Sequence, residues 1–349
     1  MKLYRHLDRT RYQMDFCINN PNRQFYEGEI TELGGKVYRI PPKSAGLNEF
    51  KRALSAVVKD NGYRHVLRVT SNAMGFLDLK IAHDAGAEVC AARSSNASDG
   101  TGWKPWLAHR LGRLLYGKYV NVKIAPSDLA AKYTFGNRAY EGGEVKMLRN
   151  AIDLSAFHYD PVGRKSVRAE FGIPEGTKIV GHVGRFQEQK NHSYLIKVFS
   201  ELCKRMDDAR LLLVGEECET ASCVRRFVNE LGLGSRVIFA GVRRDIPQLL
   251  SAMDVFVFPS RFEGMPNTVI EAQAAGLPCV IADTITREAD ITGLVTYLPI
   301  VGNPVAWCKP IVAALSQTRR NDLTADFIRA GYEITSSVRE FERIIWGAE

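Results

Sequence analysis

Two glutamates frame a short turn whose residue types are suited to bind a sugar beside a phosphate. In "PSRFEGMPNTVIEAQAAGLP" (259–278), Glu263 precedes a Gly-Met-Pro-Asn turn and Glu271 follows after seven intervening residues. An apolar run before the turn predicts a strand, and the helix formers after it predict a helix. Unpaired N–H groups attract anions at the start of such a helix: those of Asn267, Thr268 and Val269. Two carboxylates beside an anion site match the polarity of a nucleotide sugar, although an ordinary acidic helix start fits the same pattern.

A second loop places two cations where a diphosphate could bind. In "GHVGRFQEQKNH" (181–192) a strand is predicted to end at Gly184, and Arg185 and Lys190 follow before a helix that starts around Asn191. Ligands of open α/β sheets bind beyond the carboxyl ends of the strands. Cations beside a helix N-terminus at that edge favour a diphosphate, whereas the alternative is a loop with two solvated charges.

The elements that must position these loops alternate along the second half of the chain. Continuous apolar runs predict strands over 178–186, 210–216, 236–241, 254–260 and 277–283. Helical periodicity falls between them, over 191–206, 223–233, 245–253 and 267–276. Such alternation is typical of a parallel sheet covered on both faces. Residues of about 165–330 therefore form one doubly wound α/β domain.

The first half shows a similar but weaker alternation. Strands are predicted over 12–19, 36–42, 65–71, 87–93 and 122–127, and helices over 48–62, 75–86 and 106–119. The chain opens on a helical segment, "MKLYRHL", with no strand and Gly-rich turn ahead of it. We expect a first domain over 1–160, a second over 161–333, and a last helix over 334–349 that packs back on the first domain.

Composition excludes several classes of protein. The chain has 349 residues, 45% hydrophobic and 25% charged, as in soluble globular proteins of two domains. It has no apolar run long enough to span a bilayer and no secretory h-region. Seven scattered cysteines without a Cys-x-x-Cys pair indicate reduced thiols, not a disulfide framework or a zinc site. The formal net charge of +8 comes from Lys and Arg in residues 1–150, a surface that attracts phosphates or is merely solvated.

The order of these motifs resembles one enzyme family. The strand with Gly-Arg and Lys, then "LLLVGEE" and "VIFAGVRRDIPQLLSAMDVFVFPSRFEGMPNTVIEAQAAGLPCVIADTI", is similar to the retaining family-four glycosyltransferases, closest to their exopolysaccharide and capsular-polysaccharide branch. The likeness spans essentially the whole chain and is strongest over 178–290. It implies a GT-B fold, in which two Rossmann-like domains face each other across a cleft. The donor nucleotide sugar would bind the second domain and the acceptor the first.

The resemblance also implies a role for each matching residue. Glu263, Arg185 and Lys190 would be catalytic, with the two cations on the donor diphosphate and Glu263 on the transferred sugar. The remaining donor contacts would come from Gly184, Val242, Arg243, Gly264, Met265, Pro266, Asn267, Thr268 and Glu271. Val242 and Arg243 would lie against the base, and Glu271 would bind the ribose. No metal or other cofactor is expected, and a UDP-sugar is the expected donor.

Two departures from the family pattern concern the first domain. Family members begin with a strand and a Gly-Gly loop before the helix that "MKLYRHLDRTRYQMDF" resembles, so we expect a truncated or misplaced start. The branch carries His-Ser-His-Asn at the end of a first-domain strand, where this chain has "ARSSNASDG" (92–100). Arg93 and Ser95 thus replace the histidines and Asn96 is retained, so Ser95 and Asn96 are the candidate acceptor-side residues. His83 and His109 are expected on helix surfaces.

Aromatic and basic residues are mixed over "TGWKPWLAHRLGRLLYGKYVNVK" (101–123). A basic amphipathic helix with aromatics is typical of a membrane-surface element, and a core helix with a basic outer face is the alternative. We therefore expect a cytoplasmic protein that can associate with the inner face of an anionic plasma membrane.

The main prediction is a glycosyltransferase that transfers a sugar, with retention, to a saccharide or lipid-diphosphate-linked acceptor in surface-polysaccharide synthesis. One alternative is a nucleotide-sugar-binding protein with impaired catalysis, which the substituted histidines favour. A second alternative is a sugar-nucleotide epimerase. A nucleic-acid partner is not expected, because no recognition motif accompanies the basic residues.

Overall fold

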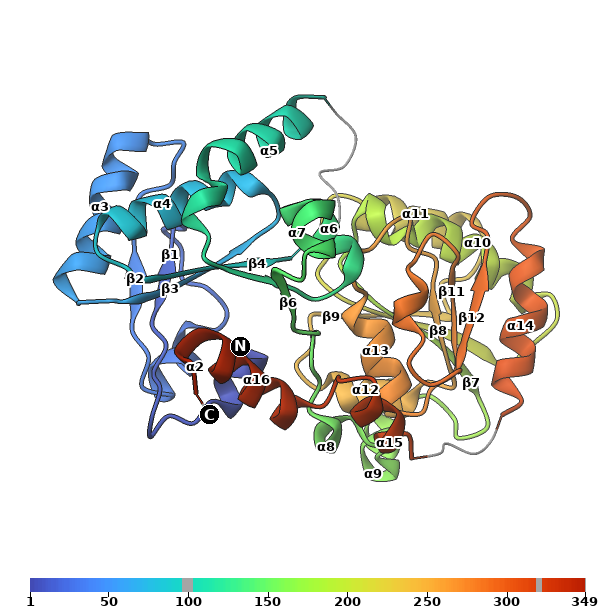
Figure 1. The fold of residues 1–349 in the computed structure, drawn as a ribbon. Coiled ribbons are helices and arrows are strands. Elements are labelled where there is room, and N and C mark those ends of the chain that lie inside the picture. The colour runs from blue at the N-terminus through green and yellow to red at the C-terminus, as the bar shows by residue number, and fades with distance from the viewer. Residues whose placement is uncertain (96–102, 318–321, 349) are drawn as a thin grey trace. The chain divides into compact units, whose positions relative to one another are not determined.

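A computed structural model describes residues 1–95, 103–317 and 322–348 (Figure 1). The chain divides into two compact units. The first contains Met1–Ala151 and Gly331–Glu349, and the second contains Ile152–Ala330. Each unit is an α/β layer structure with parallel sheets, as the alternation of elements predicts.

The second unit is built on one six-stranded parallel sheet. Its strands are β7 (Lys178–Val183), β8 (Ala209–Val214), β9 (Val237–Gly241), β10 (Val255–Phe258), β11 (Cys279–Ala282) and β12 (Val295–Leu298). They are ordered β12-β11-β10-β7-β8-β9. The chain therefore starts at the centre, winds to one side through β8 and β9, and then returns to wind to the other side. This is the doubly wound order of dinucleotide-binding sheets, whose ligands bind where the winding reverses, between β7 and β10.

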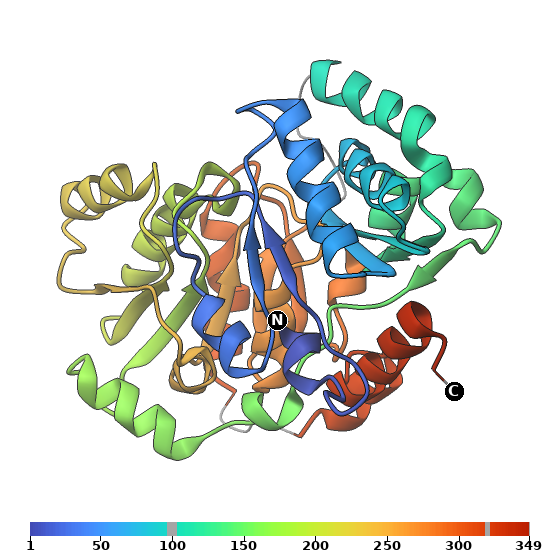
Figure 2. The same cartoon turned by 90° about the vertical axis from the view of Figure 1, so that its left-hand side faces the viewer.

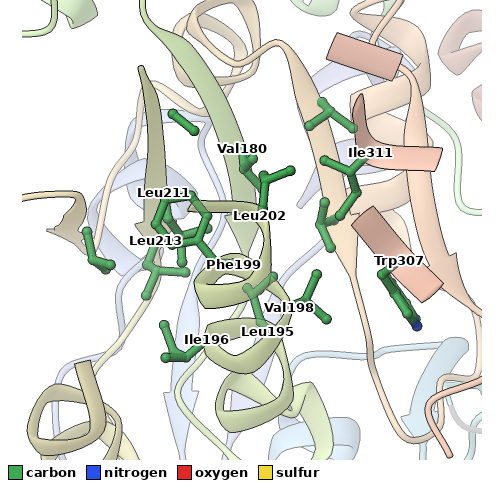
Figure 3. Close-up of a cluster of buried hydrophobic side chains, with 14 of the residues drawn as sticks. Val180, Leu195, Ile196, Val198, Phe199, Leu202, Leu211, Leu213, Trp307 and Ile311 are labelled. Carbon is green, nitrogen blue, oxygen red and sulfur yellow. The ribbon is translucent and has the colours of Figure 1, made fainter. Parts of the chain in front are cut away.

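Helices cover both faces of this sheet, which explains the continuous apolar strands. The helices are α8 (Leu154–Phe157), α9 (Pro161–Glu170), α10 (His192–Cys203), α11 (Ala221–Glu230), α12 (Ile246–Ala252), α13 (Asn267–Ala274), α14 (Val305–Leu315) and α15 (Thr324–Arg329). Figure 3 shows Phe199 of α10 beside Leu211 and Leu213 of β8, with Ile311 and Trp307 of α14 on the other side of the cluster. All four residues of β10 are buried.

The first unit contains two separate parallel sheets. One pairs β1 (Phe16–Ile18) with β2 (Val37–Arg39). The other is ordered β3-β4-β5-β6, and its strands are β3 (His65–Thr70), β4 (Val89–Ser94), β5 (Val122–Ala125) and β6 (Val145–Met147). Among the described residues, β1 pairs only with β2 and β3 only with β4. Between β1 and β3 lies a cavity of about 570 Å³.

Helices again lie on both faces of the first unit's sheets. They are α1 (Lys2–His6), α2 (Glu27–Glu32), α3 (Leu47–Asp60), α4 (Phe76–Asp84), α5 (Trp103–Tyr116), α6 (Asp128–Phe135), α7 (Asn137–Glu141) and α16 (Ile334–Trp346). The C-terminal α16 packs against α1, and its Phe341 and Ile345 share a core cluster with Tyr4. The opening helix and the C-terminal helix are therefore neighbours in this unit.

The position of α5 distinguishes the two interpretations of this basic, aromatic segment, a membrane-surface element and a core helix with a basic outer face. Figures 1 and 2 show α5 along the outside of the first unit. It is attached through Gly112, where a Cβ would lie only 2.7 Å from the backbone of Ala73. Trp103 and Leu114 are 70% and 79% exposed. The expectation of a core helix with a basic outer face is therefore wrong, because the apolar face points outward.

His109 is also placed differently from the expectation. It is buried on the attached side of α5, where its Nδ1 accepts a hydrogen bond from Ala73 N. Its Nε2 lies 3.0 Å from the carbonyl oxygen of Tyr133, to which it donates. The prediction of a surface histidine is wrong for His109, whose ring ties α5 to the body of the unit, whereas His83 is exposed as expected.

Candidate active site

Two loops meet at the carboxyl edge of the second unit's sheet, at the point where the winding reverses. Residues 184–191 follow β7, and residues 259–266 follow the adjacent strand β10. Because parallel strands end at a common edge, the two predicted motifs come together although more than 70 residues separate them in sequence. The sheet order thus explains why the Gly-Arg-Lys loop and the Glu263 loop form one site.

An ion pair joins the two loops. Lys190 Nζ lies 2.7 Å from Glu263 Oε1, with both side chains mostly buried. The Ser260 hydroxyl donates to the same carboxylate oxygen at 2.6 Å. Lys190 Nζ also lies 4.7 Å from the centre of the Phe258 ring, a cation–π contact. The site therefore satisfies its buried lysine with its own glutamate, since an unpaired buried charge would be costly.

Backbone contacts hold the loops in this register. The side-chain Nδ2 of Asn191 donates to Pro259 O at 3.1 Å, and the backbone N of Arg261 donates to Gln189 O at 2.8 Å. The side chain of Gln189 donates in turn to Phe262 O at 2.9 Å. These bonds fix the loops in addition to the Lys190–Glu263 ion pair.

Gly184 lies in a tightly packed position. A Cβ at Gly184 would lie 3.1 Å from His182 Nε2 and 3.2 Å from Lys190 Cδ. Gly215, after β8, has φ of 154° and a Cβ there would lie 2.2 Å from Gly184 O. The absence of side chains lets the two turns pack against each other and leaves Gly184 backbone close to Lys190.

Two buried histidines pack against the base of the loop that follows β7. His182 Nδ1 lies 2.9 Å from Val257 O, and His192 stacks on Phe186 with ring centres 4.2 Å apart. Burial holds the pKa of His182 well below its usual value, and His192 and Lys190 add to that effect. Burial, aided by Lys190, lowers the pKa of His192 to about 4. Both rings are therefore neutral at pH 7, and Lys190 is the cation of this cluster.

The helix after the Glu263 loop begins as predicted, but one of its N–H groups is already used. α13 starts at Asn267, and Val269 N donates to Pro266 O at 3.0 Å. The expectation that Val269 N–H is free for an anion is therefore wrong. Glu271 lies one turn into the helix and is partly exposed. The helix is anchored by buried Gln273, which donates to Ala289 O at 2.7 Å and so fixes its orientation.

The remaining predicted donor residues lie around the same edge or beside it. Arg185 is exposed, and no carboxylate of the described residues forms an ion pair with it. Val242 is 63% exposed after β9. Arg243 contacts Glu170 of α9 and also lies 2.7 Å from Asp245, so its pKa is raised. Arg243 thus braces the β9 loop on α9, a position from which only its flank could touch a base.

The first unit carries the two candidate acceptor-side residues, of which Asn96 lies outside the described residues. Ser95 follows β4, and its N–H donates to Thr70 O at 2.9 Å, which leaves the side chain exposed at the carboxyl edge of the sheet. Arg93 is a partly buried residue of β4. Its Nη2 donates to Asn150 Oδ1 at 2.7 Å, and burial lowers its pKa.

Some residues that build this site were missed from the sequence. Ser260, Gln189, Asn191 and Thr284 hold the loops together, and Thr284 does so by donating to Ser260 O at 2.9 Å. The sequence does not distinguish these residues, because each is a polar residue near the end of a strand, where polar residues are common. Among the described residues, no group of three His, Cys, Asp or Glu side chains could hold a metal ion.

Comparison with known proteins agrees with this site. The family described as "Glycosyl transferases group 1" matches residues 177–317, which include both loops. "Putative glycosyltransferase EpsF" of Bacillus subtilis is 33% identical over 347 residues, covering 97% of this chain and 89% of that protein. The similarity to EpsF thus extends over both units.

A more distant relative and a solved structure add detail. The Escherichia coli "UDP-Gal:alpha-D-GlcNAc-diphosphoundecaprenol alpha-1,3-galactosyltransferase" is 31% identical over 144 residues, 40% of this chain and 37% of that enzyme. The crystal structure of Anabaena Alr3699/HepE in complex with UDP and glucose matches with a TM-score of 0.73 and 18% identity. The match covers 94% of this chain and 90% of that chain, which shows a shared fold.

Proposed function

The chain belongs to the group 1 glycosyltransferases and has the GT-B fold that its sequence predicts, and from this premise we propose that it is a retaining enzyme which uses a UDP-sugar. Its acceptor would be a saccharide or a lipid-diphosphate-linked sugar in surface-polysaccharide synthesis. The observation that carries the proposal is the meeting of the Lys190 and Glu263 loops at the winding reversal of the second sheet. The UDP in the HepE structure and in the E. coli relative's name supports the choice of nucleotide.

Each residue of the site has a proposed role. Lys190 and Arg185 bind the diphosphate, and the start of α13 adds N–H donors and a favourable helix dipole. Glu263 binds hydroxyls of the transferred sugar and Glu271 binds the ribose. Backbone of Gly264, Met265, Pro266, Asn267 and Thr268 approaches the sugar and phosphates, while Val242 and the flank of Arg243 lie against the base.

This arrangement stabilises the charge that develops during transfer. As the bond from the sugar to the diphosphate breaks, negative charge grows on the leaving group and positive charge on the sugar ring. Lys190 and Arg185 oppose the first charge, and such electrostatic stabilisation is usually the largest single contribution to catalysis. The Lys190–Glu263 ion pair must loosen for this purpose, so Glu263 becomes available to the sugar when Lys190 turns to the phosphate.

The first unit is proposed to bind the acceptor, with Ser95 and Asn96 near the reacting hydroxyl. The name of the E. coli relative specifies an acceptor on diphosphoundecaprenol, a lipid-diphosphate carrier, which supports that acceptor class here. Retention of the anomeric configuration is proposed from the resemblance to family-four enzymes. Proton NMR of the product's anomeric signal tests it, and an inverted linkage would contradict it.

The donor proposal is tested by thermal-shift measurements with UDP, GDP, ADP and CMP. A nucleotide at about 100 times its dissociation constant stabilises the folded protein by about 2.7 kcal/mol. We expect a shift with UDP that is lost in Glu271→Ala, which removes the ribose contact. A cooperative melt with no shift for any nucleotide would contradict the donor site.

We also propose that α5 docks the enzyme on the cytoplasmic face of an anionic membrane. Its outward face carries six exposed large apolar side chains: Trp103, Trp106, Leu107, Leu111, Leu114 and Leu115. The helix contains no acidic residue, and Arg110 lies 4.9 Å from the Trp106 ring. Tryptophan and arginine on an apolar helix face favour the boundary of anionic lipid. In the described part of the chain no helix is long and apolar enough to cross a membrane.

Liposome sedimentation tests this docking. The protein should sediment with vesicles that contain phosphatidylglycerol and much less with phosphatidylcholine vesicles. Trp103→Ser combined with Leu114→Ser should abolish sedimentation while the UDP thermal shift stays, because both side chains are exposed and touch no donor residue. If this variant sedimented with the vesicles as well as the parent protein does, the docking proposal would be contradicted. The donor-site proposal would not be affected.

A further inference from the structure

Ser260 is a fully buried residue beside the proposed donor site. It follows β10 and is 0% exposed. Its hydroxyl lies 2.6 Å from Glu263 Oε1 and 3.1 Å from Gln189 O. A serine hydroxyl has a single proton to donate. The shorter contact, to a charged acceptor, is the stronger one, so in this structure the proton belongs to Glu263.

The two carboxylate oxygens of Glu263 have different surroundings. Lys190 Nζ, at 2.7 Å, and the Ser260 hydroxyl both contact Oε1. Within residues 1–95, 103–317 and 322–348, no donor contacts Oε2. The protein therefore holds this side chain through Oε1, and Oε2 is the oxygen left to accept hydrogen bonds from the hydroxyls of a sugar.

The backbone around Ser260 is fixed, so its hydroxyl has a defined position. Asn191 Nδ2 donates to Pro259 O at 3.1 Å, immediately before Ser260, and Thr284 Oγ1 donates to Ser260 O at 2.9 Å. A short serine side chain on a fixed backbone has little freedom left to lose. The longer Glu263 side chain loses more rotamer freedom when it is held, so it needs a partner to stay in place.

Binding of a donor would remove one of the two partners of Glu263. In the proposed complex Lys190 turns to the diphosphate, which leaves Glu263 with the Ser260 hydroxyl. The Glu263 side chain is only 9% exposed, and a buried carboxylate without a partner is costly. Without that hydroxyl, Glu263 would stay on Lys190 in competition with the phosphates, or leave the position from which Oε2 reaches the sugar.

We propose that Ser260 is a positioning residue for sugar transfer. Its hydroxyl holds Oε1 of Glu263 while Lys190 is on the diphosphate, so that Oε2 accepts hydrogen bonds from the transferred sugar. This inference rests on the proposed function, because it needs Glu263 on the sugar and Lys190 on the diphosphate. It deepens that function by assigning part of the discrimination between UDP and a UDP-sugar to a residue that acts through Glu263.

The ratio of two dissociation constants tests the proposal. Calorimetric titration of the full chain measures the constant for UDP and the constant for UDP-glucose or UDP-galactose, whichever the parent protein binds more tightly. Ser260→Ala should raise the constant for the UDP-sugar relative to that for UDP by about tenfold, near the lower end of what a hydrogen bond to a charged group contributes. Because UDP carries no sugar, its own constant should change much less.

Further variants separate positioning from support of the loop, and a cooperative melt shows that each is folded. Ser260→Cys keeps a weak donor of similar size and should give an intermediate ratio, also if Ser260→Ala does not fold. Thr284→Val removes the bond to the Ser260 backbone but keeps the Ser260 hydroxyl, so it should change both constants alike. Glu263→Ala removes the whole sugar contact, and adding Ser260→Ala to it should raise the ratio no further.

Two outcomes would overturn the positioning role and leave the proposed function standing. An unchanged ratio in Ser260→Ala, with or without weaker UDP binding, would mean that the hydroxyl does not act on the sugar contact. A rise in the ratio that is as large in the Glu263→Ala background as in the parent would mean that Ser260 acts independently of Glu263. Failure of the proposed function has a different result: Glu263→Ala itself would leave the ratio unchanged, and the inference would fail with it.

Discussion

The two units differ in how their sheets are built: the second has one six-stranded parallel sheet, whereas the described residues of the first form two separate parallel sheets. In the second unit Val180 of β7 is 1% exposed, with strands on both edges and helices on both faces. In the first unit Val69 of β3 is 48% exposed, although helices flank it. The difference between a central strand and a bordering one is thus visible in side-chain exposure as well as in backbone pairing.

This contrast indicates that helical cover alone does not bury a parallel strand. Each strand of such a sheet needs a neighbour on both edges before its side chains leave water, unless it lies at the sheet's outer border. A region with fewer buried apolar contacts opens more readily, so we expect lower local stability around β3 than around β7. The two loops of the proposed donor site follow strands of the well-buried sheet, which suits a site that must hold its charges in place.

The largest expected effect comes from a matched pair of leucine truncations. Leu211→Ala in β8 removes a side chain that is 0% exposed and should cost about 2–5 kcal/mol of unfolding free energy. Leu67→Ala in β3 removes a partly exposed side chain beside the cavity and should cost less than about 2 kcal/mol. Native-state hydrogen exchange measures each unit separately. Equal losses of unfolding free energy in the two variants would mean that β3 is buried in solution like a central strand. This result would contradict the difference between the two units.

A second difference is the response of the second unit to acid. The folded pKa of His192 is about 4, below its usual value near 6.5, because the ring is buried. As pH falls below about 6.5 the unfolded chain binds the proton and the folded one does not, so stability falls by about 1.4 kcal/mol per pH unit until the folded group titrates. Urea unfolding between pH 7 and 4 measures the slope. His192→Asn should reduce it, and an unchanged slope would exclude His192 as its source.

Much of the second unit could be predicted from its sequence, because its strands are continuous apolar runs. "RLLLVGE" and "DVFVFPS" coincide with β8 and β10, since only a strand buried on both faces tolerates such runs. The first unit was harder. The short strand β6 (Val145–Met147) and the helices α6 and α7 were missed, because three residues carry too little periodicity to be recognised.

The candidate site was predictable in its residues but not in its internal contacts. The motif spacing identified Lys190 and Glu263 separately, yet nothing in the sequence says that they pair, since that depends on β7 and β10 being neighbours. His109 was misjudged because a helix position does not reveal which face is attached. Its burial follows from the close approach of Gly112 to Ala73, a contact between segments far apart in the chain.

An intermediate effect should appear at the proposed donor site, beside the six-stranded sheet of the second unit. Lys190→Ala removes a charged hydrogen-bond donor and should weaken UDP binding by about 1.5–3 kcal/mol, roughly tenfold to 150-fold. Lys204→Ala, just beyond the other end of α10, is the matched control, because that lysine is exposed and forms an ion pair with Glu201. Calorimetric titration with UDP compares the two. If Lys190→Ala bound UDP with the same affinity as the parent protein, the proposed contact between Lys190 and the diphosphate would be contradicted.

The smallest expected effect concerns the first unit, through the helix that covers one face of its cavity. Glu333 caps α16, accepting bonds from Thr335 N at 2.7 Å and Ser336 N at 2.8 Å. Burial alone would raise its pKa, but these backbone donors outweigh that effect and lower the pKa to about 2. Because the folded pKa is depressed, the stabilisation is present above about pH 4.5 and is lost as pH falls toward 2.

Glu333→Ala should therefore destabilise α16 by about 0.5–2 kcal/mol at pH 7 and by much less near pH 2. Exchange of the α16 amides at the two pH values measures this, after correction for intrinsic rates. Glu340, which is partly exposed and pairs with Arg343 on the same helix away from its start, provides the control as Glu340→Ala. The acid window of this cap lies below that of His192, so acid should weaken the second sheet before it loosens α16. The amides of α16 could instead lose their protection from exchange at a higher pH than the amides of β8. That result would contradict the assignment of the lower pH range to Glu333 and the higher one to His192.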